Sequence, residues 1–144
     1  MESAAQQAAQ RFTEGFNCAQ SVLAGYAAQL GLDEPPAMRV ASAFGGGMCH
    51  LGQACGAVVG ALMAIGLRHG RVRADDAEAK ARTHELARRF TDEFLRRHGH
   101  LTCTDLLGVD LDSPEGIRQF RERNLRERCA EWVRSAAEIV APLL

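Results

Sequence analysis

Proline is scarce in this chain, and its distribution limits the fold more than any other feature. The four prolines among 144 residues stand at positions 35, 36, 114 and 142, so the stretches between them are free to be helical. Alanine, arginine, leucine and glutamate, all good helix formers, dominate those stretches. No segment alternates apolar and polar residues as a strand does. We therefore expect an all-α fold, a single-domain antiparallel helical bundle over residues 1–144.

Residues that favour helix ends divide the chain into segments. Asn17, Thr102 and Ser113 are typical N-caps, and glycines 15, 31 and 108 are typical stops. These signals predict helices over residues 4–14, 18–30, 37–44, 54–67, 76–98, 102–107 and 114–140, the last with a break near residue 124. Two apolar stripes are expected to face the core, namely Phe12, Phe16, Ala19, Leu23 and Tyr26, and Leu125, Cys129, Trp132, Ala136 and Val140.

A glycine-rich loop, Gly45 to Gly52, precedes a helix rich in small residues. Glycine costs about 1 kcal/mol against alanine inside a helix, so Gly56 and Gly60 indicate that another helix or a cofactor approaches the backbone closely. The loop lacks a GxxxxGK[ST] sequence and follows no predicted strand, which disfavours nucleotide binding. The sequence thus predicts a Gly-rich loop before a buried small-residue helix.

Charge and hydropathy argue against two classes of partner. The formal net charge is −1, without the basic surplus that phosphate binding requires, so we expect no nucleic acid. The most apolar segment, residues 54–67, is shorter than the roughly 20 residues that span a bilayer. No basic region followed by an apolar run stands at the N-terminus. These features predict a cytoplasmic protein without a membrane span.

The five cysteines form no CxxC pair, so the thioredoxin and zinc-ribbon patterns are absent. Cys18, Cys55 and Cys103 each fall in the first turn of a predicted helix, where free amide groups and the helix dipole favour a thiolate. We expect lowered pKa values there. Cys129 belongs to an inner stripe and should point into the bundle. Each cysteine taken alone also fits a small buried hydrophobic residue.

Several motifs together resemble one family. Cys55-Gly56-Ala57-Val58-Val59-Gly60 gives a CGAxxG motif, and Phe16-Asn17-Cys18-Ala19-Gln20, the loop from Phe44 to Met48 and the segment from Cys103 to Gly108 accompany it in order. The chain resembles the redox-active proteins named for their C-GCAxxG-C-C cysteine pattern. The resemblance covers nearly the whole chain and implies four family cysteines, Cys18, Cys55, Cys103 and Cys129, with Cys49 outside the pattern. A related domain accompanies an iron–sulfur cluster in some multihaem cytochromes.

The hypothesis that we rank first is a cofactor site for electron transfer or redox sensing. Cys18, Cys55, Cys103 and Cys129 would hold an iron–sulfur cluster, with [2Fe–2S] favoured, or another thiophilic metal. Cys49 is a candidate extra ligand, and His50, His98 and His100 leave mixed Cys/His zinc coordination open. The redox partner is unidentified, and the alanine- and glycine-rich helix face is compatible with a homodimer.

Two alternatives involve no metal. In the first, the protein is a thiol–disulfide oxidoreductase or a thiol redox sensor, with Cys55 as nucleophile and Cys18, or else Cys49, as the resolving thiol. In the second, the protein is a structural or interaction module with inert buried cysteines. Whether the chain is an enzyme is therefore open; if it is one, it is an oxidoreductase acting through cysteine thiols.

Overall fold

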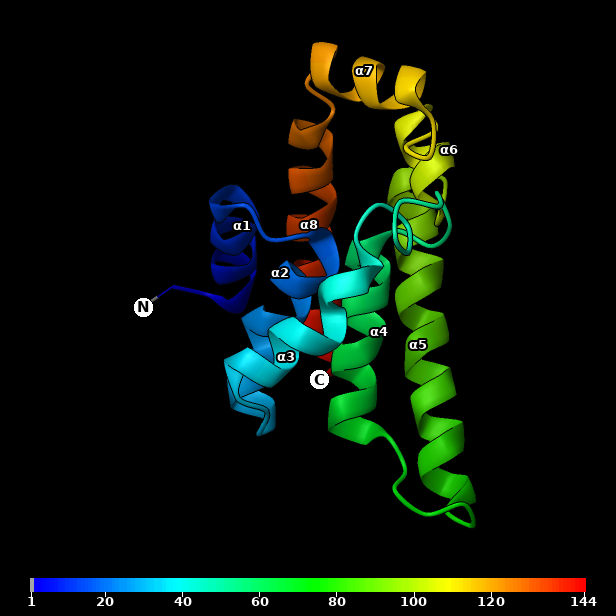
Figure 1. The fold of residues 1–144 in the computed structure, drawn as a ribbon. Helices are drawn as coiled ribbons and strands as arrows, with labels where there is room; N and C mark the ends of the chain where they lie inside the picture. Colours follow the sequence, from blue (N-terminus) through cyan, green and yellow to red (C-terminus); the bar gives the residue numbers. More distant parts are fainter. Residues whose placement is uncertain (1) are drawn as a thin grey trace.

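The structure is a computed structural model that describes residues 2–144, and in that range every regular element is a helix (Figure 1). The all-α prediction is confirmed. The α-helices are α1 (Ala4–Glu14), α2 (Cys18–Ala27), α3 (Glu34–Ala41), α4 (Gly56–His69), α5 (Ala77–His98), α6 (Cys103–Leu107), α7 (Pro114–Glu122) and α8 (Arg126–Val140), and short 3-10 turns cover Ala28–Leu30, Ser42–Phe44 and Ala141–Leu143.

The capping residues set the helix boundaries as the sequence predicts. The Asn17 side chain accepts a hydrogen bond from the Gln20 amide at 2.8 Å, and the Gln20 side chain accepts one from the Asn17 amide at 3.1 Å. This reciprocal capping box fixes the start of α2. Thr102 and Ser113 cap α6 and α7 in the same position. The predicted break before α8 occurs at Asn124, whose φ is 49°.

Two expectations about the N-terminal half need correction. Helix α3 begins at Glu34 rather than after Pro35-Pro36, because prolines are tolerated in a first turn, where amide groups have no helical partner. Phe16 does not join the inner stripe and is 37% exposed. It lies between the end of α1 at Gly15 and the cap of α2, so it no longer follows the helical period.

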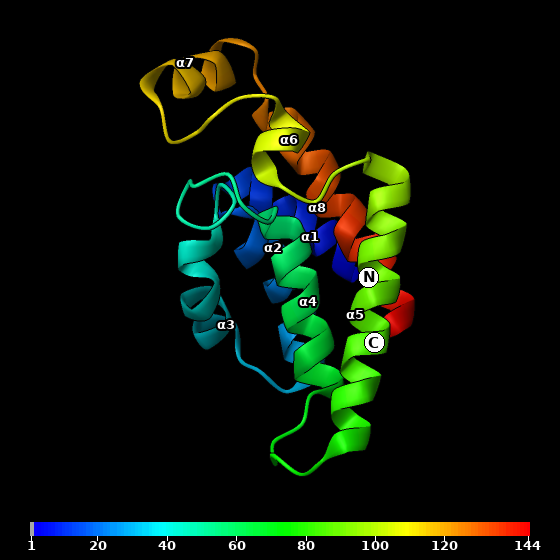
Figure 2. The ribbon, with the colours of Figure 1, turned by 90° about the vertical axis from the view of Figure 1, so that its right-hand side faces the viewer.

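The longer helices lie side by side around one apolar core. Helices α4 and α5 run in opposite directions, and α8 returns antiparallel to α5 (Figures 1 and 2). Helices α2, α4 and α8 begin toward the same end of the bundle, where α6 and α7 also lie (Figure 1). The core is one cluster whose largest fully buried side chains include Leu23, Ile65, Phe90 and Phe94.

Helix α4 packs against α2 almost backbone to backbone. A Cβ atom added at Gly60 would lie 2.8 Å from the Ala19 carbonyl oxygen, and one added at Gly56 would lie 2.9 Å from the Cys18 Cβ. Real side chains do not approach so closely. The two glycines therefore serve the close helix approach that the small-residue pattern predicts, and they bring the starts of α2 and α4 together.

Within the described residues, 2–144, none of the helices has both the length and the apolar character that a bilayer crossing demands.

Candidate functional site

Four cysteines from distant parts of the sequence line one cavity of about 320 Å³. Cys18 is the first residue of α2, Cys55 caps α4, Cys103 is the first residue of α6 and Cys129 lies in the first turn of α8. The cavity therefore lies where four helix N-termini meet, with Cys55, Cys103 and Cys129 buried and Cys18 half-buried. All four thiols are free.

Backbone hydrogen bonds hold Cys55 beside Cys103. The Cys55 amide donates to the Leu101 carbonyl at 2.8 Å, and the Cys103 amide donates to the Gln53 carbonyl at 2.7 Å. These bonds form an isolated antiparallel bridge between Ala54 and Thr102. Because main-chain bonds fix the starts of α4 and α6 against each other, this pair of cysteines has little freedom to separate. We call Cys55 and Cys103 the bridged pair.

The glycine-rich loop packs against the bridged pair in an unusual backbone conformation. Residues 46–50 all have positive φ, including the non-glycine residues Met48 (69°), Cys49 (42°) and His50 (65°). A Cβ at Gly47 would lie 2.6 Å from the Gln53 amide nitrogen and 2.7 Å from the Cys103 Cβ, so only glycine fits there. The loop thus forms a short left-handed turn that closes one wall of the cavity.

A side-chain hydrogen bond links Cys18 to Cys129. The Cys18 thiol donates and the Cys129 sulfur accepts, which raises the pKa of Cys18 and lowers the pKa of Cys129. Burial also raises the pKa of Cys18, whereas the positive charges of Arg126 and Arg128 help to lower the pKa of Cys129. We call Cys18 and Cys129 the hydrogen-bonded pair. Of the four cavity cysteines, Cys129 is the one that this arrangement stabilises as a thiolate.

The expectation of lowered pKa values at the first-turn cysteines is wrong for all three. Burial raises the pKa of Cys55 to about 11, although the amides of Ala57 and Val58 at the start of α4 act in the opposite sense. Burial and the neighbouring sulfurs of Cys55 and Cys129 raise the pKa of Cys103 to about 12. The helix-terminus effect is present at Cys55, but removal of the thiolate from water outweighs it.

Large apolar side chains complete the cavity wall, and part of this wall comes from the segment around α7. Leu111, Ile117 and Phe120 line the cavity together with Phe12 of α1 and Trp132 of α8. The inner stripe of α8 is buried as the sequence predicts, at residues Leu125, Cys129, Trp132, Ala136 and Val140. The cysteines therefore lie in largely apolar surroundings, which explains the strong effect of burial on their pKa values.

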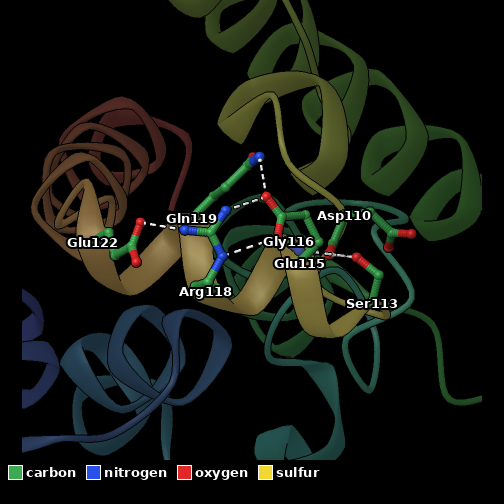
Figure 3. A network of polar contacts seen from close by, with 7 residues as sticks. All are labelled: Asp110, Ser113, Glu115, Gly116, Arg118, Gln119 and Glu122. Carbon is green, nitrogen blue, oxygen red and sulfur yellow. Dashed lines mark hydrogen bonds and ion pairs between the residues drawn. The ribbon is translucent and has the colours of Figure 1, made fainter.

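The polar contacts of α7 lie within its own segment (Figure 3). The Arg118 guanidinium pairs with Glu115 and with Glu122, the latter at 2.6 Å. Ser113 accepts from the Gly116 amide and donates to the Asp110 carbonyl, both at 3.0 Å. The helix is thus stabilised on its solvent side by local contacts, while its apolar residues cover the cavity.

The four remaining candidate ligands lie in four different environments. Cys49 is exposed and does not line the cavity, whereas its neighbour His50 does. His98 contacts the Ser135 hydroxyl at 2.7 Å and packs on Phe94, so it joins α5 to α8. His100 lies in a shallow surface hollow with Thr104 and Asp105. Of the three histidines, the structure places only His50 with the four cysteines.

Two arginines line the cavity that sequence reasoning did not single out. Arg121 belongs to α7 and Arg126 begins α8. Among the described residues that line the cavity, none is a carboxylate, so its permanent charges are positive. The only sequence signal for Arg126 is its place three residues before Cys129, which puts both on one helix face.

The donor set fits a thiophilic centre, but a site for a single ion is not preformed. Four thiols around one cavity match in type and number the ligands of an iron–sulfur cluster. Within residues 2–144, no three His, Cys, Asp or Glu side chains are already gathered closely enough to hold a metal ion.

Comparison with known proteins identifies one family. The family described as "Putative redox-active protein (C_GCAxxG_C_C)" matches residues 16–143, nearly the whole chain. The match spans all four cavity cysteines and the CGAxxG segment at the start of α4. No curated protein and no solved structure matches the chain.

Proposed function

The chain belongs to the C_GCAxxG_C_C family of redox-active proteins, and on that premise we propose that its four cavity cysteines form the redox centre. Cys18, Cys55, Cys103 and Cys129 would hold a [2Fe–2S] cluster for electron transfer or redox sensing. The observation that carries this proposal is that four thiols, none adjacent in sequence, line one largely apolar cavity. A bound cluster supplies one-electron redox chemistry at this position.

The surrounding residues suit a negatively charged centre. Each cysteine lies at a helix N-terminus, where unpaired amide groups can donate hydrogen bonds to sulfur. Arg121 and Arg126 add positive charge at the cavity wall. The apolar side chains around α7 and α8 limit the access of water, which lowers the local dielectric and strengthens these interactions.

Reconstitution tests the cluster. Reduced protein is incubated anaerobically with ferrous iron and sulfide, and iron, acid-labile sulfide and the visible spectrum are measured. We expect about two irons and two sulfides per chain with charge-transfer absorption, and loss of both in Cys55→Ser or Cys129→Ser. Cys49→Ser is the matched control, since Cys49 lies outside the cavity, and it should bind like the wild type. Fully reduced protein that binds no iron would overturn the cluster proposal.

A second candidate function, thiol–disulfide exchange without metal, is favoured by the hydrogen-bonded pair. Sequence reasoning chose Cys55 as nucleophile, but its pKa of about 11 leaves it protonated at neutral pH. Cys129 would instead attack a partner disulfide and release one partner thiolate. Cys18 would then attack the Cys129 sulfur of the mixed disulfide, releasing the second partner thiolate and leaving a Cys18–Cys129 disulfide.

Mild oxidation distinguishes this candidate from the cluster. Metal-free protein is treated with oxidised glutathione, and its disulfides are mapped by mass spectrometry. A Cys18–Cys129 disulfide that forms reversibly supports exchange chemistry. If neither iron uptake nor an intramolecular disulfide is found, both redox proposals fail, and the cysteines act as structural residues.

A further inference from the structure

We propose that Arg126 is the positioning residue that sets the reduction potential of the cysteine centre, by holding a permanent positive charge against the cavity wall next to Cys129. This inference rests on the proposed function and deepens it. It requires that the centre is redox-active, but it holds for a cluster and for a dithiol alike.

Contacts with α1 hold the Arg126 guanidinium in place. It donates to the Phe12 carbonyl at 2.6 Å and to the Phe16 carbonyl at 3.4 Å. Its central carbon also lies 3.9 Å from the centre of the Phe12 ring, a cation–π contact. The Phe12 carbonyl also accepts from the Gly15 amide at 3.1 Å, so Arg126 adds a second donor at the C-terminal end of α1. These contacts span more than a hundred residues of sequence and fix a side chain that would otherwise be mobile.

The positive charge of the fixed guanidinium stabilises negative charge on sulfur, because no carboxylate among residues 2–144 lines the cavity to pair with it. Arg126 and Cys129 are three residues apart on α8, so they share one face of the helix. Both line the cavity, and among the described lining residues there is no acidic side chain to neutralise the arginine. An arginine keeps its charge at every accessible pH. Negative charge on the centre is therefore stabilised by Arg126 in a way that pH does not remove.

The direction of the effect is the same for both kinds of centre. A dithiol carries more negative charge, as thiolate, than the disulfide formed when it loses two electrons, so a nearby cation favours the reduced form. A cluster gains negative charge on reduction, and a nearby cation again favours the reduced form. Loss of the Arg126 charge should make the centre more reducing in either case.

The test compares the potentials of charge-changing and charge-keeping variants. In the metal-free protein, the thiol–disulfide equilibrium with glutathione is measured for wild type, Arg126→Gln and Arg126→Lys. We expect Arg126→Gln to shift the equilibrium about tenfold toward the disulfide, roughly 30 mV. Arg126→Lys should remain near the wild type. Arg123→Gln is the matched control, since Arg123 is exposed, as Arg126 is, but does not line the cavity.

Two outcomes would overturn the inference. An Arg126→Gln potential equal to the wild type overturns it. A Lys variant that shifts as far as the Gln variant also overturns it, because the cause would then be the lost contacts with Phe12 and not the charge. If Arg126→Gln does not fold, Arg126→Met, whose chain can still cover the Phe12 ring, replaces it under the same criteria.

For a reconstituted cluster, a potentiometric titration replaces the glutathione assay, with the same expected direction for Arg126→Gln and the same control. Failure of the proposed function is separate from failure of this inference. A wild-type protein with neither a dithiol couple nor a cluster couple overturns the proposed function itself. A measurable couple whose potential Arg126→Gln leaves unchanged overturns only the role of Arg126.

Discussion

The two pairs of cysteines around the cavity are held by different parts of the polypeptide. Main-chain hydrogen bonds fix the bridged pair, Cys55 and Cys103, through the bridge between Ala54 and Thr102. Side chains govern the hydrogen-bonded pair, since Cys18 donates to Cys129 and Arg126 adds charge. Backbone geometry therefore determines position in one pair, and side-chain electrostatics determines protonation in the other.

The difference shows that proximity and reactivity are separate properties of a cysteine site. The bridged pair is the more rigidly placed, yet burial leaves both of its thiols protonated at neutral pH. In the hydrogen-bonded pair, the contact with Cys18 lowers the pKa of Cys129 and so favours a thiolate there. The bridged pair is therefore suited to holding a redox centre in place, and the hydrogen-bonded pair is suited to supplying a reactive thiolate.

The largest expected effect that tests this comparison is the pH dependence of alkylation in reduced, metal-free protein. A pKa of about 11 makes the thiolate fraction of Cys55 at neutral pH about a hundredfold lower than that of an ordinary thiol. Thiolate forms as pH rises through the pKa. Because the pKa of Cys129 is lowered, its alkylation rate should rise at a lower pH than that of an ordinary thiol. The rates at Cys55 and Cys103 should rise only near pH 11 and 12.

Mass spectrometry of iodoacetamide labelling at each cysteine measures these profiles. The midpoint of each profile is compared, and not the absolute rate, because burial also slows access. Exposed Cys49 reports how the reagent itself behaves with pH. A midpoint for Cys55 below that of Cys129 would contradict the assignment of the two pairs.

Gly47→Ala is expected to have the largest effect on stability, because it acts on the bridged pair. The new Cβ would lie 2.6 Å from the Gln53 amide nitrogen, at a residue whose φ is 73°. Steric overlap and the left-handed backbone together should lower the free energy of unfolding by about 2–4 kcal/mol. Urea denaturation measures the free energy of unfolding. A loss below about 1 kcal/mol would show that main-chain contacts do not hold the bridged pair rigidly.

Gly60→Ala tests the contact that joins the two pairs, since Cys18 begins α2 and Cys55 caps α4. Its Cβ would lie 2.8 Å from the Ala19 carbonyl, so the helices must move apart, at a cost of about 1–3 kcal/mol. Gly66→Ala is the control on the same helix, where a Cβ meets nothing within 4 Å. That change should stabilise the protein by about 0.5–1 kcal/mol. Equal effects at the two positions would rule out close α2–α4 packing as the reason for Gly60.

Local signals in the sequence were sufficient for the helices and insufficient for the cavity. Caps such as Asn17, Thr102 and Ser113 act within three or four residues, so their positions predict helix starts directly. The bridge between Ala54 and Thr102 joins segments far apart in sequence, and neither residue type signals it. The meeting of the four cysteines was expected from the family resemblance, not from their spacing.

The electrostatics of the site was the least predictable part. A first-turn position favours a thiolate in a solvated helix, but the sequence did not show how deeply Cys55 and Cys103 are buried. The left-handed turn is not predictable from the sequence either, because Met48 and Cys49 are not residue types that usually adopt positive φ. Arg126 is recognisable only once α1 lies against α8.

The smallest expected effect concerns the solvent side of α7, whose ion-paired residues do not line the cavity that holds both pairs of cysteines. Arg118→Gln removes the ion pairs with Glu115 and Glu122, but all three side chains are exposed, and such pairs contribute little in water. The melting temperature and the alkylation profiles of the cysteines should both stay at wild-type values. Phe120→Ala, two residues further along the same helix, removes part of the apolar cavity wall and should accelerate alkylation of the cavity cysteines. If Arg118→Gln accelerated alkylation as much as Phe120→Ala, the polar contacts of α7, and not its apolar face, would control access to both pairs.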